Sequence, residues 1–410
     1  MKIAFLSYEC PPEAGGGIGT YIWEASRMLA ARGHHVEVFA GSPNRSSTSE
    51  LPDGVIVHRV EVADRRTFPA KIAPLVVERH LAVQFDVLEG PDYMAEATEA
   101  RRLLTDLPYV VKLHTSMYFV RQIEYAAMEL RERISHRWKS FRRGVPPDWS
   151  AKHPVSRREV EEVLAAGRIA SPSRAIGERV VREWGASPAK VDSFPYPFSP
   201  TKKYLRIPIG NESQIVTFVG RLELRKGVIN LAKAIPYVLR ICPDAKFWFV
   251  GGTLGSPLPG VSMEDFLKQR LAKHADSVEF KGRQDPEHLP AILGRSAIAV
   301  FPSLWESFGY VCLEAMAAGR AVIGSQNCGL EELLDGGRVG RVIDPHSPED
   351  IAAKIIELLQ NANERHRLGE LARERVLSTY APDVVGPQQE ACYERAIQMP
   401  HTTPILRASV

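Results

Sequence analysis

Residues 301–319 read FPSLWESFGYVCLEAMAAG, and they carry the most specific pattern in the chain. The apolar run 297–301 predicts a strand, and a helix is predicted to begin near 307–309. Glu306 lies in the loop between them, and Glu314 lies inside the helix, flanked by apolar residues. A buried carboxylate is unstable unless it is hydrogen-bonded or paired. The vicinal hydroxyls of a ribose would partner Glu314, and sugar hydroxyls would suit Glu306; a structural salt bridge is the alternative.

Strands and helices alternate on both sides of this segment. The C-terminal half predicts a helix at 228–240 and strands at 215–219, 246–250, 278–280, 297–301 and 321–324. Strands that alternate with helices build a parallel sheet. This half is therefore predicted to be a doubly wound α/β domain.

The first of these strands runs directly into the loop GRLELRKG, residues 220–227. Loops at the carboxyl ends of parallel strands line the ligand crevice of an open α/β sheet. Arg221 and Lys226 would place two cations in that crevice, where a diphosphate is the anion that they suit. The alternative is an exposed charged loop without a ligand.

The N-terminal half repeats the order of strand, loop and helix. It predicts helices at 20–32 and 175–184 and strands at 2–7, 36–40, 55–60, 85–89, 109–114 and 169–173. The glycine-rich loop 15–19 precedes the first helix, where backbone amides could contact a phosphate. Its spacing fits neither a dinucleotide fingerprint nor a Walker loop, because position 20 is Thr and no Gly-Lys-Ser/Thr follows. A flexible surface loop is the alternative.

A proline-rich stretch, residues 195–213, has little periodicity and is typical of a linker. It divides the chain into an N-terminal domain, 1–197, and a C-terminal domain, 198–381. A last helix at about 382–400 is predicted to cross back to the N-terminal domain. The length of 410 residues suits two such domains.

Composition excludes several classes of protein. The net charge of +3 is too small to indicate nucleic-acid binding, and none of the five cysteines forms a C-x-x-C pair. This cysteine pattern fits a reducing, cytoplasmic compartment and argues against a zinc site. The first apolar run is too short for a signal peptide, and no run of about 18 apolar residues could span a membrane. Because Asp-x-Asp is also missing, we expect neither a metal nor a cofactor.

Taken together, these segments resemble the retaining glycosyltransferases of family 4, which have the GT-B fold. The resemblance covers nearly the whole chain: the glycine-rich loop, the Gly-Arg…Lys-Gly loop, the Glu-x7-Glu element and the last helix. The Glu-x7-Glu element is its most specific part. It implies two Rossmann-like domains facing a deep cleft, with a nucleotide-sugar donor bound mainly by the C-terminal domain.

The resemblance also implies roles for the matching residues. Arg221 and Lys226 would hold the donor diphosphate, Glu314 the ribose, and Glu306 the hydroxyls of the donor sugar. His114, at the end of strand 109–114, would lie beside the reacting sugar. His114, Arg221, Lys226 and Glu306 are therefore the predicted catalytic residues. The remaining predicted donor contacts are the loop glycines, a base-contacting arginine and three positions after Glu306: Gly16, Gly17, Arg283, Ser307, Phe308 and Gly309.

Two other features bear on the acceptor. Asp92 is a candidate for contact with the acceptor, with a turn-forming aspartate as the alternative. The basic, aromatic-bearing segment 121–143 suits an anionic membrane surface and a lipid-linked acceptor; a charged outer helix or a subunit contact is the favoured alternative.

The chain departs from the family pattern in three places. Residues 328–332 read CGLEE where the family often has Gly-Gly-x-Pro-Glu, and Ala321 replaces a proline. Between the domains, Pro195-Tyr196-Pro197 replaces Pro-Asn-Gly. The first change would alter the sugar subsite, and the last would alter the hinge or the acceptor geometry.

The resemblance implies transfer of a hexose-type sugar from a UDP- or GDP-sugar with retention of anomeric configuration. The acceptor would be a saccharide, a lipid-linked saccharide or a small molecule, in polysaccharide or glycoconjugate synthesis. Alternatives are a nucleotide-sugar epimerase or phosphorylase on the same fold, or a non-catalytic nucleotide-sugar-binding subunit. The sequence leaves the nucleotide base, the sugar and the oligomeric state open.

Overall fold

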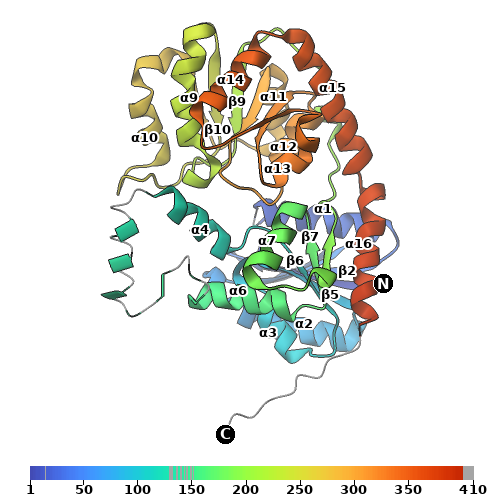
Figure 1. Ribbon diagram of the computed structural model, residues 1–410. Coiled ribbons are helices and arrows are strands. Elements are labelled where there is room, and N and C mark those ends of the chain that lie inside the picture. Colours follow the sequence, from blue (N-terminus) through green and yellow to red (C-terminus); the bar gives the residue numbers. More distant parts are fainter. Residues whose placement is uncertain are drawn as a thin grey trace.

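The computed structural model describes residues 1–13, 15–128 and 152–399, together with 133, 134, 137, 138, 141, 142, 144, 146, 147 and 150. Within these residues the chain forms two β-sheets of mainly parallel strands, each covered by helices (Figure 1). The predicted pair of doubly wound α/β sheets is thereby confirmed.

The N-terminal sheet has eight strands in the described residues, in the order β3-β4-β2-β1-β5-β6-β7-β8. Only β3 is antiparallel to its neighbour. The strands are β1 (Lys2–Ser7), β2 (His35–Ser42), β3 (Ser47–Glu50), β4 (Ile56–Glu61), β5 (Val87–Pro91), β6 (Tyr109–Lys112), β7 (Arg168–Ser171) and β8 (Val191–Ser193). The α-helices among them are α1 (Gly17–Ala31), α2 (Phe68–Val83), α3 (Thr98–Leu103), α4 (Met117–Ala127), α6 (Pro154–Ala165) and α7 (Arg174–Trp184).

The C-terminal sheet is parallel throughout, with six strands in the described residues and the order β11-β10-β9-β12-β13-β14. They are β9 (Ile215–Val219), β10 (Lys246–Val250), β11 (Val278–Gly282), β12 (Ile298–Phe301), β13 (Ala321–Ser325) and β14 (Arg341–Ile343). The α-helices of this half are α8 (Lys202–Leu205), α9 (Val228–Ile241), α10 (Met263–Arg270), α11 (Leu289–Arg295), α12 (Tyr310–Ala317), α13 (Gly329–Leu333), α14 (Pro348–Leu359), α15 (Ala362–Thr379) and α16 (Pro382–Ile397).

The central strands of both sheets are buried apolar runs. Residues 3–6 of β1 and 298–301 of β12 are almost completely inaccessible. Helices cover both faces of such strands, which is why their sequence is continuously apolar instead of alternating. This property let the sequence predict them.

Each sheet has one point where the strand order reverses. In the N-terminal sheet β1 lies between β2 and β5, and in the C-terminal sheet β9 lies between β10 and β12. The loops at such a point diverge and leave a crevice at the carboxyl ends of the strands. The two carboxyl edges face each other, because the hydroxyls of Thr115, after β6, and Ser307, after β12, are 3.1 Å apart.

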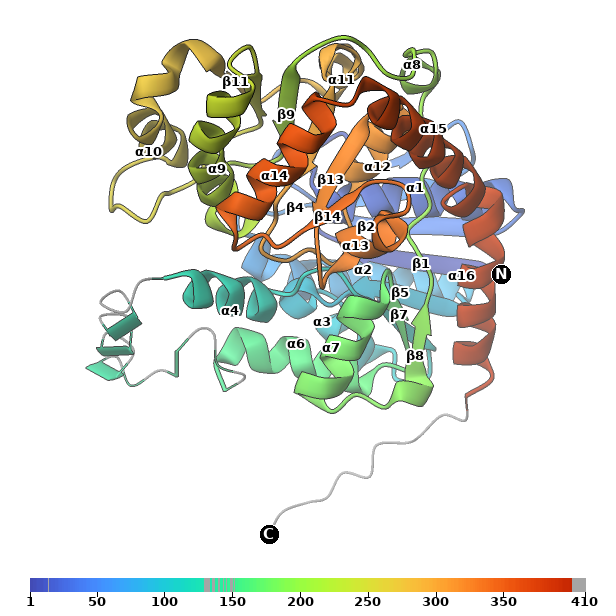
Figure 2. The ribbon, with the colours of Figure 1, turned by 45° about the horizontal axis from the view of Figure 1, so that its top comes forward.

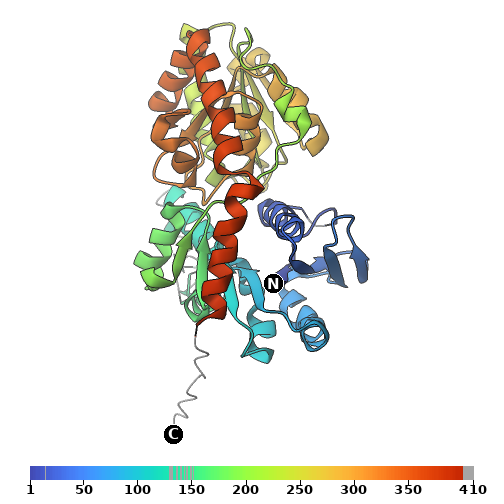
Figure 3. The ribbon, with the colours of Figure 1, turned by 90° about the vertical axis from the view of Figure 1, so that its right-hand side faces the viewer.

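The last helix, α16, returns from the C-terminal domain to the N-terminal one (Figure 3). It contacts α1, β5, β6 and β7 of the first sheet. At the centre of this contact the buried Glu89 carboxylate accepts hydrogen bonds from the hydroxyls of Tyr21 (2.7 Å) and Tyr393 (2.8 Å). Gln389 donates to both tyrosine oxygens. A specific polar cluster therefore docks α16.

The segment 121–143, predicted as a basic surface helix, is described only in part. The structure places residues up to Ala127 in α4, which lies against α6 (Figure 2). Most of 128–151 lies outside the described residues. Among the residues that are described, no helix is long and apolar enough to cross a membrane.

Candidate active site

The loop 220–227 is fixed by close contact of its backbone with neighbouring loops. A β-carbon on Gly227, which has φ 69°, would lie 1.8 Å from the carbonyl oxygen of Pro302, after β12. The Leu304 amide donates to the Arg225 carbonyl oxygen at 2.8 Å. Glycine is therefore required at 227, and the loops after β9 and β12 form one unit at the point where the strand order reverses.

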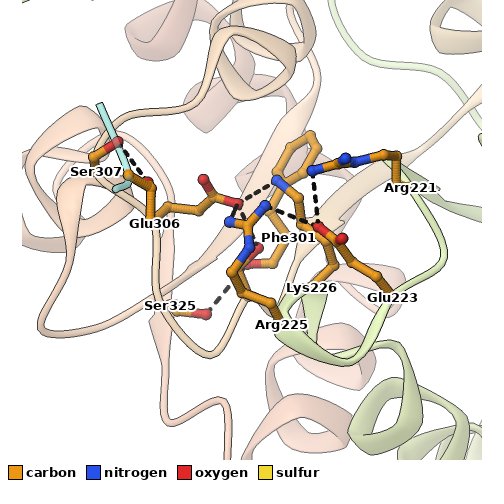
Figure 4. A network of polar contacts seen from close by, with 10 residues as sticks. Arg221, Glu223, Arg225, Lys226, Phe301, Glu306, Ser307 and Ser325 are labelled. Atoms are coloured by element: carbon orange, nitrogen blue, oxygen red, sulfur yellow. Dashed lines mark hydrogen bonds and ion pairs between the residues drawn. The ribbon is translucent and has the colours of Figure 1, made fainter. Parts of the chain in front are cut away.

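This unit holds a cluster of charges (Figure 4). Glu306 is 9% exposed, and its Oε1 atom accepts hydrogen bonds from Arg225 Nη1 at 3.0 Å, from Ser303 Oγ at 3.3 Å and from Lys226 Nζ. Arg225 also donates to Glu223 at 2.8 Å. Burial alone would raise the pKa of Glu306, but the Lys226 and Arg225 charges hold this pKa below its usual value. Glu306 is therefore a carboxylate fixed by two cations.

The arginines of the loop have different environments. Arg225 is 7% exposed and pairs with both carboxylates, whereas the Arg221 side chain is 60% exposed and, among the described residues, pairs only with Glu223, at 3.3 Å. Arg221 is thus free to turn towards a ligand. Arg225, to which the sequence analysis gave no role, anchors Glu306.

Lys226 is intermediate in exposure between Arg225 and Arg221. Its side chain is 18% exposed and bonds Glu306. Burial lowers its pKa, and the Glu306 carboxylate opposes that effect. A cation held at the crevice in this way is prearranged for an anionic ligand.

The segment after Glu306 connects the two domains. The Ser173 hydroxyl, after β7, donates to the Ser307 carbonyl oxygen at 2.7 Å. The Phe308 ring packs against the ring of Tyr196 in the linker, with the two ring centroids 4.6 Å apart. Gly309 precedes the first residue of α12. The structure therefore brings Ser307 and Phe308 to the face between the domains, whereas the neighbours of Gly309 belong to the C-terminal domain.

Glu314 projects from α12 and is half-buried. The Tyr204 hydroxyl lowers the pKa of Glu314 and the Glu24 charge of α1 raises it, but both effects are smaller than that of burial. Burial raises the pKa of Glu314 to about 7. The carboxyl group does not contact the Glu306 cluster, so the two glutamates of the motif lie in separate polar environments.

The raised pKa of Glu314 makes stability depend on pH. Since the native state holds this proton more tightly than the unfolded chain does, the free energy of unfolding falls as pH rises from about 4.5 to about 7. Glu314→Gln should remove this pH dependence. Its free energy of unfolding should rise by about 1–3 kcal/mol relative to that of the parent as pH rises from about 4.5 to about 7. Urea unfolding of both proteins at several pH values measures the difference, and parallel curves would contradict it.

His114 is 6% exposed and lies just after β6. Its amide donates to Asp92 Oδ1 at 2.8 Å, and its Nδ1 atom lies 2.6 Å from the Tyr196 hydroxyl. Burial, with Lys112 and Arg65 nearby, lowers its pKa well below the usual value. The ring is therefore neutral.

Asp92 is completely buried, and its carboxyl group accepts a hydrogen bond from the His114 backbone amide. Burial raises its pKa to about 8. In this structure Asp92 positions the His114 backbone, and its contact with an acceptor stays a prediction.

The glycine-rich loop has its own polar partners, Glu9 and Arg65. Gly16 precedes α1, and the Glu9 carboxylate accepts a hydrogen bond from the Gly19 amide at 3.2 Å. Arg65 donates to the same carboxylate at 2.9 Å. The anion at this helix terminus is thus an internal carboxylate, and Gly17 has no neighbour at its β-carbon position.

Arg283 is exposed just after β11. It lies at the carboxyl edge of the C-terminal sheet, but the structure does not join it to the Glu306 cluster.

A cavity of about 800 Å³ lies between α7 and α13. Its lining includes Trp305, but none of the predicted donor residues. The Glu332 carboxylate at its wall accepts hydrogen bonds from the amides of Arg174 (3.0 Å) and Ala175 (2.9 Å), at the start of α7. This glutamate of the divergent 328–332 segment thus joins the two domains.

In the part of the chain that the structure describes, no three His, Cys, Asp or Glu side chains gather as a metal site.

Two facing, mainly parallel sheets with a charge cluster at one switch point are the architecture expected of a GT-B glycosyltransferase. Comparison with known families agrees. "Glycosyltransferase Family 4" matches residues 15–200, and "Glycosyl transferases group 1" matches residues 205–375. Together these matches span most of the chain, and the protein belongs to glycosyltransferase family 4.

Relatives match over nearly their full length. The D-inositol 3-phosphate glycosyltransferase of Paenarthrobacter aurescens is 28% identical, with 90% of this chain and 92% of the relative covered. The glycogen synthase of Mycobacterium tuberculosis is 25% identical, with 93% and 91% covered.

Solved structures share the fold. A sucrose-phosphate synthase from Thermosynechococcus elongatus has a TM-score of 0.73 at 22% identity, covering 96% of this chain and 98% of that one. Anabaena HepE in complex with UDP and glucose has a TM-score of 0.66 at 15% identity, covering 96% and 99%.

Proposed function

We propose that this glycosyltransferase moves a hexose from a UDP- or GDP-sugar to a hydroxyl of a saccharide or polyol acceptor, with retention at the anomeric carbon. The observation that carries the proposal is the Glu306 cluster at the switch point of the C-terminal sheet, with Arg221 exposed beside it. A nucleotide diphosphate is the ligand class that fits such a crevice.

In the proposed reaction, Arg221 and Lys226 neutralise the charge that develops on the leaving diphosphate. Glu306 accepts hydrogen bonds from donor-sugar hydroxyls, and Glu314 accepts those of the ribose. The sequence supplies no Asp-x-Asp pair for a metal, and we propose that the two side-chain cations take that role. Leaving-group oxygen would assist deprotonation of the acceptor, since no carboxylate is assigned as a base or nucleophile.

Retention follows if the acceptor approaches from the face that the diphosphate leaves. Closure of the two domains would align the reactants and exclude water. The contacts of Ser307 with Thr115 and Ser173 join the domains beside the cluster, which supports chemistry at this interface.

The acceptor class rests on relatives whose names include inositol phosphate and glycogen synthesis. The proposed acceptors include a lipid-linked saccharide, because the basic segment 121–143 suits an anionic membrane surface. All five cysteines are free thiols, which supports a reducing, cytoplasmic setting.

A nucleotide panel tests the donor class. UDP, GDP, ADP and their hexose conjugates are added in a thermal-shift assay, and one nucleotide series should raise the melting temperature, because ligand at 100 times Kd adds about 2.7 kcal/mol of stability. Glu314→Ala should lose this shift. Glu374→Ala, on the exposed side of α15, is the matched control and should keep it.

Absence of a shift with every nucleotide would contradict the proposed donor site. Selective binding without sugar transfer to any acceptor in a saccharide and polyol panel would instead favour the non-catalytic subunit.

A further inference from the structure

Tyr196 stands where the family pattern has the asparagine of Pro-Asn-Gly, in the linker between β8 and α8. It is 3% exposed. Its hydroxyl oxygen lies 2.6 Å from the Leu113 carbonyl oxygen and 2.6 Å from His114 Nδ1. This departure from the family therefore puts a phenol in contact with the His114 ring.

The two short contacts fix the position of the protons. A phenol has one proton to donate, and a carbonyl oxygen can only accept. The Tyr196 proton therefore goes to Leu113, and the tyrosine oxygen must accept from His114. Nδ1 of His114 then carries a proton, and Nε2 keeps a lone pair, since the ring is neutral.

We propose that Tyr196 is a positioning residue that holds His114 in the Nδ1–H form, so that Nε2 accepts a hydrogen bond from a sugar hydroxyl. The role of Nε2 rests on the proposed function, whereas the proton position does not.

Burial supports this arrangement. It raises the pKa of Tyr196 well above the usual value, so the phenol keeps its proton. Burial and the Lys112 and Arg65 charges keep His114 neutral. Among the described residues, Nδ1 has no other hydrogen-bond partner within reach.

The Tyr196 ring also touches both domains. Its ring centroid lies 4.6 Å from that of Tyr21 in α1 and 4.6 Å from that of Phe308, which follows Glu306 in the same loop. An asparagine at 196 has no ring to fill this space. Through Tyr196, the linker therefore fixes the position of the His114 ring relative to the Glu306 loop. It also fixes which ring nitrogen carries the proton.

The test compares Tyr196→Phe with Tyr310→Phe. Both remove one hydroxyl from the same aromatic cluster, but Tyr310 donates to the Pro197 carbonyl oxygen at 3.1 Å and has no contact with the His114 ring nitrogens. Histidine ring ¹⁵N and ¹³Cδ2 NMR shifts report the tautomer, with the His114 signal assigned by its loss in His114→Asn.

We expect a single Nδ1–H form in the parent and in Tyr310→Phe, and Nε2–H signal in Tyr196→Phe. With the donor that the nucleotide panel selects, kcat should fall about tenfold in Tyr196→Phe, as expected for loss of one oriented hydrogen bond, with donor KM within about twofold. An unchanged His114 tautomer in Tyr196→Phe, or an equal loss of kcat in Tyr310→Phe, would overturn the proposal. The NMR result is independent of turnover, so failure of the proposed function would be seen separately.

Discussion

Lys226→Ala is expected to lower kcat/KM for the donor by about 10²–10³-fold, the usual effect of removing one preorganised donor to a developing anion. Lys226 is held against Glu306 at the switch point of the sheet, so its charge needs no rearrangement when the diphosphate leaves. Initial rates of nucleotide release with the parent and the variant measure the change. Lys233→Ala, exposed on α9, is the control.

A near-parental kcat/KM for Lys226→Ala would remove the assigned diphosphate site. If instead KM alone rises, Lys226 contributes equally to ground-state and transition-state binding.

Arg225→Ala is expected to destabilise the protein by about 3–5 kcal/mol, because it leaves two carboxylates short of a buried partner. Glu223 would lose its 2.8 Å contact, and Glu306 would keep Ser303 as a hydrogen-bond donor but only Lys226 as a charged partner. This should lower the melting temperature by about 10 °C. Activity should fall as well, since the geometry of Glu306 depends on this guanidinium.

The matched variant is Arg221→Ala, four positions away on the same loop. Because the Arg221 side chain is largely exposed, its loss should leave stability within about 0.5 kcal/mol. Its effect should be on donor KM. Equal melting temperatures for the two variants would contradict the division of roles between anchoring and ligand contact.

The sequence predicted the strands that both layers of helices bury. Strands β9 and β10 match the predicted bounds 215–219 and 246–250. It missed β3, β8 and β14, with the sequences STSE, VDS and RVI. These strands lie at sheet edges, are short, and carry polar residues, so pairing with a neighbour, and not local hydrophobicity, makes them strands.

Part of the candidate site could also be predicted from the sequence. Charged residues after β9 and β12 could be placed at one edge from the strand pattern alone. What sequence could not separate was Arg221 from Arg225, because the same residue type occurs twice and only the turn Leu224–Lys226 decides which side chain is buried. The position of Arg225 next to Lys226, on a loop with Glu223, was the available signal.

Contacts between distant residues were out of reach. Tyr196 and His114 meet although they are 82 residues apart, and Asp92 reaches the His114 amide from the end of another strand. The sequence singled out all three positions but could not pair them.

The docking of α16 on the first sheet has a consequence for biosynthesis. The ribosome completes β8 of the N-terminal sheet before it makes any of the C-terminal domain, yet Gln389 and Tyr393, which close the cluster around Glu89, come last. Until α16 emerges, Glu89 and Tyr21 have a face open to water along the seam that this helix later covers. The first domain to be translated is therefore completed only after the second, and the nascent chain keeps Glu89 and Tyr21 without their α16 partners throughout synthesis of the second domain.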